Sequence, residues 1–206
     1  MLRTAFAAAI LSLALTPAAL AQSGGPSRNP ADSPAGVYKI DKNHASIAAK
    51  IQHLGFSNYT FLIRGLEGEV TLDPKTPTAS KTSIRVDPNG ISTGLPDFDK
   101  EIAGNFFGGK PISFVSRTLT ATGPSAGRLV GDLTLNGVTK PVTLDVVFNG
   151  GGPQFRSNRP TLGFSATGSV KRSDFNVAPQ LPAAILGDEV RLEIEAEFNQ
   201  DLPRQG

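Results

Sequence analysis

The strongest constraint on the fold is a strict alternation of apolar and charged side chains near the end of the chain. Between Val190 and Phe198 every second residue is apolar, and the residues between them are Arg191 and three glutamates. Successive side chains of a β-strand point to opposite faces of its sheet. This stretch is therefore predicted to be a strand in a sheet that has one apolar face and one face in water.

A second stretch, Gly131–Phe148, predicts a β-hairpin. Two alternating runs flank the segment 136–141, which begins with Asn136-Gly137. Asn-Gly adopts positive φ at low cost and is typical of the turn between two strands. Pro141 has no N–H to donate, so it is expected where the second strand begins. A hairpin of this kind is common to many β-proteins and does not by itself identify a fold.

Similar runs recur along the chain, separated by turns rich in its 22 Gly and 16 Pro. About eight strands are predicted, mostly pairing with their neighbours in sequence. One short helix is predicted near 97–103, where Phe98 and Ile102 recur at helical spacing. A sheet of this kind closes on itself to remove its edges, so the predicted fold class is all-β, an eight-stranded antiparallel barrel. The other strand candidates are 37–40, 45–54, 59–72, 82–86, 112–121 and 162–170, with a turn at 41–43 and a flexible loop at 150–160.

The N-terminus has the three parts of a secretory signal peptide. Arg3 supplies the positive charge, Ala5–Leu15 is an apolar run, and Ala19-Leu20-Ala21 is a cleavage signal. The run is shorter than the ~20 residues of a membrane span, which disfavours a retained anchor. The expected organisation is a signal peptide at 1–21, a disordered leader at 22–35, a barrel domain at 36–199 and a polar tail at 200–206. The expected location is the periplasm.

Composition narrows the partners. The net charge is +2 and no basic cluster occurs, so nucleic acid is not an expected partner. There is no Cys, so stability must come from the core. An outer-membrane barrel would exchange the two faces of each strand and add aromatic girdles, but the chain has two Tyr and no Trp. Stable membrane insertion is therefore not expected, and the oligomeric state stays open, with a homodimer as one alternative.

Several short motifs, taken in order, resemble the YceI-like family of secreted proteins. The resemblance covers about Gly36–Phe198 and implies a lipocalin-like antiparallel barrel that holds a long isoprenoid lipid, such as a polyprenyl pyrophosphate or a quinone tail. Tyr38 stands where the family usually has Trp, Ala45 where it has Ser, and Leu95-Pro96-Asp97 replaces an Arg-Asp pair, which leaves the headgroup open. The motifs are Tyr38–His44, His53–Phe56, Asn105–Phe107 with Pro111–Phe114, Val130–Pro141, Lys171–Phe175 and Leu186–Val190.

An eight-stranded barrel is wide enough to hold one small ligand. The chain has 12 Phe and many branched aliphatic residues that must face inward. In a wide barrel these side chains line a cavity, and in a narrow one they mesh and fill it. By alternation and position, the expected lining is Phe61, Phe106, Phe114, Leu133, Phe164, Val170 and Phe175.

Three polar residues are candidates for contact with a headgroup. His44 and His53 are the only histidines, and each can meet a phosphate or a quinone carbonyl, although a structural hydrogen bond is the favoured interpretation. The two histidines could also ligate a metal with Asp41, but a two-histidine site with no third strong ligand in the same motif is poor evidence for one, so no metal is predicted. Arg172 is expected either to pair with an anionic headgroup or to form an exposed ion pair with Asp174.

No catalytic motif stands out: the chain has no G-x-S-x-G elbow, no Walker loop and no Cys nucleophile. The predicted function is a binding protein, not an enzyme, that holds an isoprenoid lipid for sequestration or transport and uses no cofactor besides that ligand. Two alternatives remain. One is a filled barrel that serves stress protection or protein interaction, and the other is a hydrolase or isomerase acting on an amphiphile.

Overall fold

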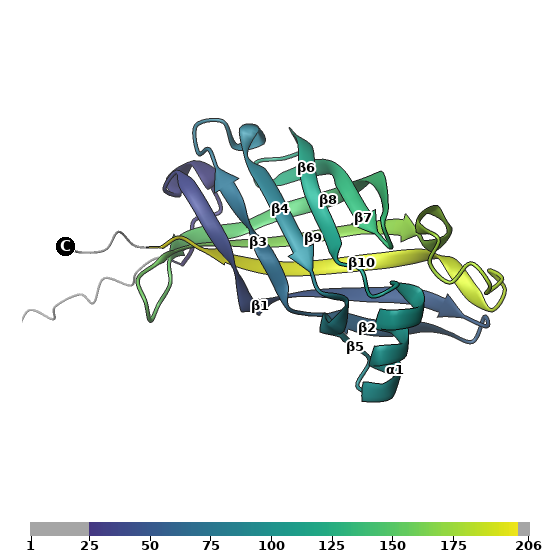
Figure 1. Ribbon diagram of the computed structural model, residues 1–206. Helices are drawn as coiled ribbons and strands as arrows, with labels where there is room; N and C mark the ends of the chain where they lie inside the picture. Colours follow the sequence, from purple (N-terminus) through teal and green to yellow (C-terminus); the bar gives the residue numbers. More distant parts are fainter. Residues whose placement is uncertain (1–24, 202–206) are drawn as a thin grey trace, which may run out of the picture.

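The strands follow one another around a closed barrel in the order of the sequence (Figure 1). The computed structural model describes residues 25–201. The first strand, β1 (Gly36–His53), pairs antiparallel with the last, β10 (Leu186–Asn199), and this pairing closes the ring. The other strands are β2 (Ser57–Ile63), β3 (Leu66–Leu72), β4 (Lys81–Val86), β5 (Ile91–Ser92), β6 (Ile112–Ala121), β7 (Ala126–Leu135), β8 (Val138–Pro153) and β9 (Pro160–Lys171).

The ten strand segments form eight strands around the barrel, as predicted, because two of these strands each consist of two segments. β2 and β3 both pair with β1, β2 along its second half and β3 along its first. Together they form one bent strand that turns at Gly65, whose φ of 68° lies in the left-handed region. β4 and β5 are likewise two parts of one strand of the barrel, because β4 pairs with β3 and β5 pairs with β2.

The alternation along β10 divides inside from outside as the sequence predicts. Leu192 and Ile194 point into the barrel, where they line the internal cavity. Glu193 lies outside and its carboxylate is 2.7 Å from the ammonium of Lys50 on β1. This charged outer wall is the opposite of the pattern that an outer-membrane barrel predicts.

The expected turn at 41–43 is a bulge within one continuous strand. The pairing of β1 with β10 shifts between Ile40, opposite Phe198, and Ala45, opposite Ala196. Four residues of β1 therefore face Glu197 alone. A bulge bends its strand and raises the local twist, which suits the tilt of strands in a barrel.

The hairpin of β7 and β8 has a tighter turn than expected. Asn136 and Gly137 alone form it, with φ of 51° and 79°, and β8 already begins at Val138. Pro141 lies inside β8, opposite Asp132, in the part of the strand that pairs only with β7. The expected flexible loop at 150–160 is also shorter, because β8 and β9 pair as far as Pro153 and Pro160.

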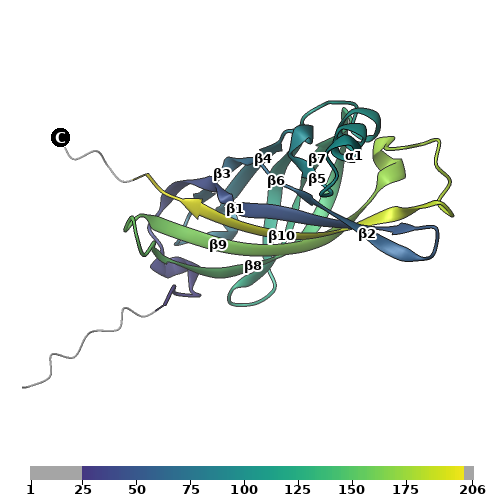
Figure 2. The same ribbon diagram turned by 90° about the horizontal axis from the view of Figure 1, so that it is seen from below.

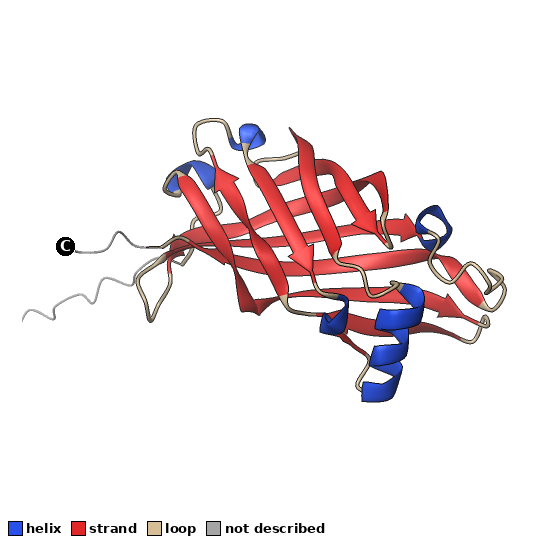
Figure 3. Cartoon of the chain, in the orientation of Figure 1, coloured by secondary structure: helices blue, strands red, loops and turns tan. Residues whose placement is uncertain are grey.

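The predicted helix covers one end of the barrel. Helix α1 (Pro96–Glu101) continues into a wider π-helical turn, Ile102–Phe106 (Figure 3). Phe98 lies against Tyr59 of β2 in an edge-on contact, with ring centroids 5.8 Å apart. Short 3-10 turns occur at Pro30–Asp32, Pro77–Ala79, Pro88–Gly90 and Arg172–Phe175.

Part of the leader expected to be disordered is ordered in the structure. Ser27 forms an isolated bridge with Gly151 of β8, and the Pro30–Asp32 turn follows it. Ser33 is buried. This segment lies against the end of the barrel that is remote from α1 (Figure 2). The predicted signal peptide at 1–21 lies outside the described residues. Within 25–201, no helix has the length and apolar character needed to cross a membrane.

Candidate functional site

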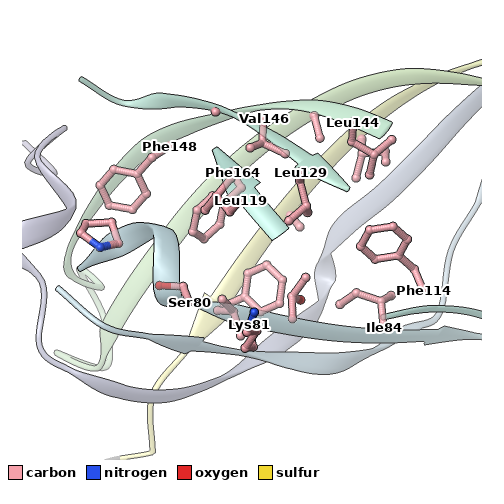
Figure 4. Close-up of a pocket in the computed structure, with 18 of the residues that line it drawn as sticks. Ser80, Lys81, Ile84, Phe114, Leu119, Leu129, Leu144, Val146, Phe148 and Phe164 are labelled. Atoms are coloured by element: carbon pink, nitrogen blue, oxygen red, sulfur yellow. The ribbon is translucent and has the colours of Figure 1, made fainter. Parts of the chain in front are cut away.

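The barrel is hollow. Chamber 1 has a volume of about 410 Å³ and is walled by strands β1, β3, β4 and β6 to β10, while chamber 2, of about 370 Å³, lies toward α1. Each volume falls within the range of small-molecule sites, roughly 300–1,000 Å³. Most residues that line the chambers are aliphatic or aromatic, and Figure 4 shows Phe114, Leu129 and Phe148 around chamber 1.

The two chambers adjoin and share four aliphatic side chains, here called the neck. Each of these residues lines both chambers. The cavity is therefore elongated along the barrel and apolar from one chamber to the other. This shape suits a long flexible chain better than a compact ligand. The neck consists of Ile47, Ile112, Leu133 and Leu192.

Six of the seven side chains expected to line the cavity do lie on its walls. Phe114 and Phe164 line chamber 1, and Leu133 lines both chambers. Phe61, Phe106 and Val170 line chamber 2.

Phe175 is the exception, because it does not line either chamber. It is 1% exposed and belongs to the closely packed cluster beside chamber 2. The reason is local: Phe175 ends the 3-10 turn after β9, so the alternation of the strand no longer sets its direction. Whether the six wall residues contact a ligand stays a prediction.

The expectations for Arg172 are wrong. Its side chain is buried and lines chamber 2, but its guanidinium faces carbonyls of the β9–β10 loop and of the start of β10. Nε donates to Gly187, one terminal nitrogen to Val177 and Ala178, and the other to Leu181 and Leu186. All five N–H donors of the guanidinium are thus used. Asp174 instead pairs with Lys140 at 2.8 Å. Arg172 is a structural residue that holds the loop, since it has no donor left for a headgroup.

The two histidines lie in different places. His53, at the end of β1, lines chamber 2, so its contact with a headgroup stays a prediction. His44 is on the bulge at the outer wall, with its side chain 57% exposed, so it cannot meet a ligand inside the barrel. Alternation fails to predict its direction because the bulge inserts extra residues.

His44 instead belongs to a small polar group on the outer wall. Its Nδ1 lies 3.0 Å from Oδ2 of Asp41 and 3.9 Å from Oε2 of Glu197. Asn199 donates to the same oxygen of Asp41 at 3.1 Å. The hydrogen bond with Asp41 and the two carboxylates raise the pKa of His44, and the hydrogen bond with His44 is the main cause that lowers the pKa of Asp41.

The side chains of Asp41, His44 and Glu197 have the donor types that bind a metal. Their ligand atoms lie within 4.8 Å of one another, and the third, Glu197, comes from β10, which sequence spacing does not reveal. The group is largely satisfied by its own hydrogen bonds, and exposed groups of this kind are common without an ion.

One end of chamber 1 is polar, and its most important residue was not predicted. Lys81 lies at the first position of β4 and its Nζ donates to the carbonyl of Arg117 at 2.9 Å. By alternation with Thr82 and Ile84, which line the chamber, Lys81 should face outward. It borders the chamber because β4 begins there and β6 has diverged from it.

The fold and the cavity together define a closed up-and-down barrel with an apolar interior, the architecture in which lipocalins hold a small ligand. The sequence matches the YceI-like domain over residues 38–198, and the chain belongs to this family. It is 35% identical over 170 residues to the UPF0312 protein YE1254 of Yersinia enterocolitica, covering 78% of this chain and 86% of that protein.

Solved structures share the fold. BcnA of Burkholderia cenocepacia superposes with a TM-score of 0.68 at 21% identity, over 77% of this chain and 98% of that one. A polyisoprenoid binding domain from Saccharophagus degradans, implicated in plant cell wall breakdown, superposes with a TM-score of 0.59 at 14% identity, over 80% of this chain and 98% of that one.

Proposed function

We propose that this protein binds a long isoprenoid lipid inside its barrel and keeps it from water for sequestration or transport. The observation that carries the proposal is the pair of apolar chambers joined at the neck. The polyisoprenoid binding domain with the same fold supports the choice of an isoprenoid. The signal-peptide pattern at 1–21 supports action in the periplasm.

The energetics favour a long apolar chain. Each CH₂ group moved from water into an apolar site contributes about 0.8 kcal/mol. A prenyl chain of several units therefore gains enough to offset the loss of its conformational freedom, up to the practical affinity limit of roughly −18 to −21 kcal/mol. An apolar wall supplies this energy without any specific polar contact, so the lipid can slide or bend within the cavity.

Binding accounts for the site better than catalysis does. Among the described residues of the chamber walls, His53 is the only histidine, and none is Asp, Glu or Cys. A hydrolase or isomerase needs a second positioned group. The filled-barrel alternative is disfavoured by the two chambers.

The direct test is to purify the protein from its native host, extract it and identify bound lipids by mass spectrometry. We expect an isoprenoid released on denaturation, in up to one copy per barrel. Protein stripped of lipid is expected to take up added decaprenol. Recovery of no apolar lipid, together with no uptake of polyprenyl compounds, would contradict the proposal. A native mass spectrum of the intact protein shows whether it is a monomer or the homodimer that the sequence leaves open.

A further inference from the structure

The wall of chamber 1 has a seam between β4 and β6, where the backbone pairing of the two strands ends. The backbones of these strands pair only from Ser83, opposite Val115, to Val86, opposite Ile112. Beyond Ser116, β6 continues to Ala121 and pairs with β7 alone. In Figure 1 the upper ends of β4 and β6 diverge accordingly.

Two hydrogen bonds that involve side chains cross the seam where the backbone ladder ends. The backbone N–H of Thr82 donates to Oγ of Ser116 at 2.8 Å, and Nζ of Lys81 donates to the carbonyl of Arg117 at 2.9 Å. Both residues of β4 also line chamber 1. The seam is thus a polar border of an otherwise apolar cavity.

Apart from Ser113, which lies in the paired part of β6, the polar side chains that line chamber 1 gather at this border. They come from the turn before β4, from the β6–β7 turn and from the ordered N-terminal segment. Among the described residues that line chamber 1, none is Asp or Glu, so the border combines a positive charge with neutral hydroxyls and an amide (Figure 4). The residues are Asn29, Thr78, Ser80, Lys81, Thr82 and Ser125.

Lys81 is the cation of the chamber walls that keeps donors for a ligand. An ammonium has three N–H donors, and the hydrogen bond to Arg117 uses one of them. Arg172, the cation on the wall of chamber 2, uses all five of its donors on backbone carbonyls. An ammonium binds a phosphate oxygen through charge-assisted hydrogen bonds, which are about twice as strong as neutral ones.

We propose that the β4–β6 seam is the headgroup site and that Lys81 binds the phosphate of an anionic prenyl lipid. The lipid tail then runs from chamber 1 through the neck into chamber 2. This inference rests on the proposed function and deepens it, because it selects a prenyl phosphate or pyrophosphate over a neutral quinone. The nearby hydroxyls, Thr78, Ser80 and Ser125, supply neutral donors for the remaining phosphate oxygens.

The test compares two probes with the same tail, geranylgeranyl diphosphate and geranylgeraniol, on the lipid-free protein. We expect the wild type to bind the diphosphate more tightly. Lys81→Gln should reduce that preference by about 10-fold or more while its affinity for the alcohol is unchanged. Lys75→Gln is the matched control: Lys75 is exposed, as Lys81 is, and lies at the same end of the barrel, but it does not line the chamber.

Lys81→Arg should keep the preference, since it keeps the charge and the donors. Equal binding of both probes by the wild type, or an unchanged preference in Lys81→Gln, would overturn the headgroup assignment and leave the lipid-binding proposal intact. Failure of the wild type to bind either probe would contradict the proposed function itself. Displacement of the diphosphate by an equal concentration of inorganic phosphate would identify a free-phosphate site and also overturn the assignment.

Discussion

The guanidinium of Arg172 donates a 2.7 Å hydrogen bond to the carbonyl of Ala178, a residue whose φ of 47° lies in the left-handed region. Asn176, two residues earlier, has a φ of 52°. Left-handed backbone at non-glycine residues costs free energy, so other contacts must hold it in place. The buried arginine does so by linking three carbonyls of the β9–β10 loop to two carbonyls at the start of β10.

Arg172→Met should therefore destabilise the protein strongly. The substitution keeps much of the volume but leaves the loop carbonyls without their donors, so we expect a loss of about 3–5 kcal/mol in the free energy of unfolding. Urea unfolding followed by circular dichroism measures it. Arg117→Met is the control, because Arg117 forms an exposed pair with Asp132 at 2.7 Å, and such pairs contribute about 0–1 kcal/mol. Equal effects of the two substitutions would refute the structural role of Arg172.

The pair of His44 and Asp41 predicts a pH dependence of stability. The pKa of His44 is raised in the folded protein, so its contribution is present below the ordinary histidine value of about 6.5 and is lost as pH rises through the raised pKa. The pKa of Asp41 is lowered, so its contribution is present above its ordinary value of about 4 and is lost as pH falls through the lowered pKa.

The stabilisation is thus expected between about pH 4 and pH 6.5. The urea midpoint of His44→Gln should fall below that of the wild type at about pH 5.5 and match it at about pH 9. The shift should be small because the histidine is exposed. His53→Gln controls for the loss of an imidazole. A difference that grows toward high pH would mean that the charged form of His44 does not stabilise the fold.

A bulky side chain at the neck should separate long ligands from short ones. Leu192→Trp places an indole between the two chambers, so decaprenol should bind at least about 10-fold more weakly, whereas geraniol, which fits within one chamber, should be much less affected. Arg191→Trp is the control, because the neighbouring side chain is exposed on the outer wall. Equal loss of both alcohols would mean that a long ligand does not pass the neck.

Gly131 on β7 leaves room for the ring of Phe114. A Cβ at this position would lie 2.6 Å from Cε2 of Phe114 and 2.7 Å from the carbonyl oxygen of Val115. Gly131→Ala should therefore displace a wall residue of chamber 1 and cost about 1–3 kcal/mol in the free energy of unfolding. For Gly123→Ala the nearest atom is 3.6 Å away, and the change should stay within about 0.5 kcal/mol. Thermal unfolding of both variants checks the difference.

Most of the fold could be predicted because its information is local. Side chains of a strand alternate whatever the rest of the chain does, so the inner face of β10 and the lining positions Phe61 and Phe164 follow from the sequence. The predictions fail where alternation is interrupted. His44 lies on a bulge, Phe175 on a 3-10 turn, and Lys81 at a strand end beside the seam.

The strand pattern, the pairing of neighbouring strands and the apolar inner face can be read from the amino-acid sequence, since each depends on residues close together along the chain. The assembled barrel leaves the interior open, because the width of a barrel depends on the combined stagger of all its strands. It also places Arg172 against a loop and Lys81 at the border of chamber 1. Those positions depend on contacts with Ala178 and Arg117, and no periodic pattern encodes which distant carbonyl a cation meets.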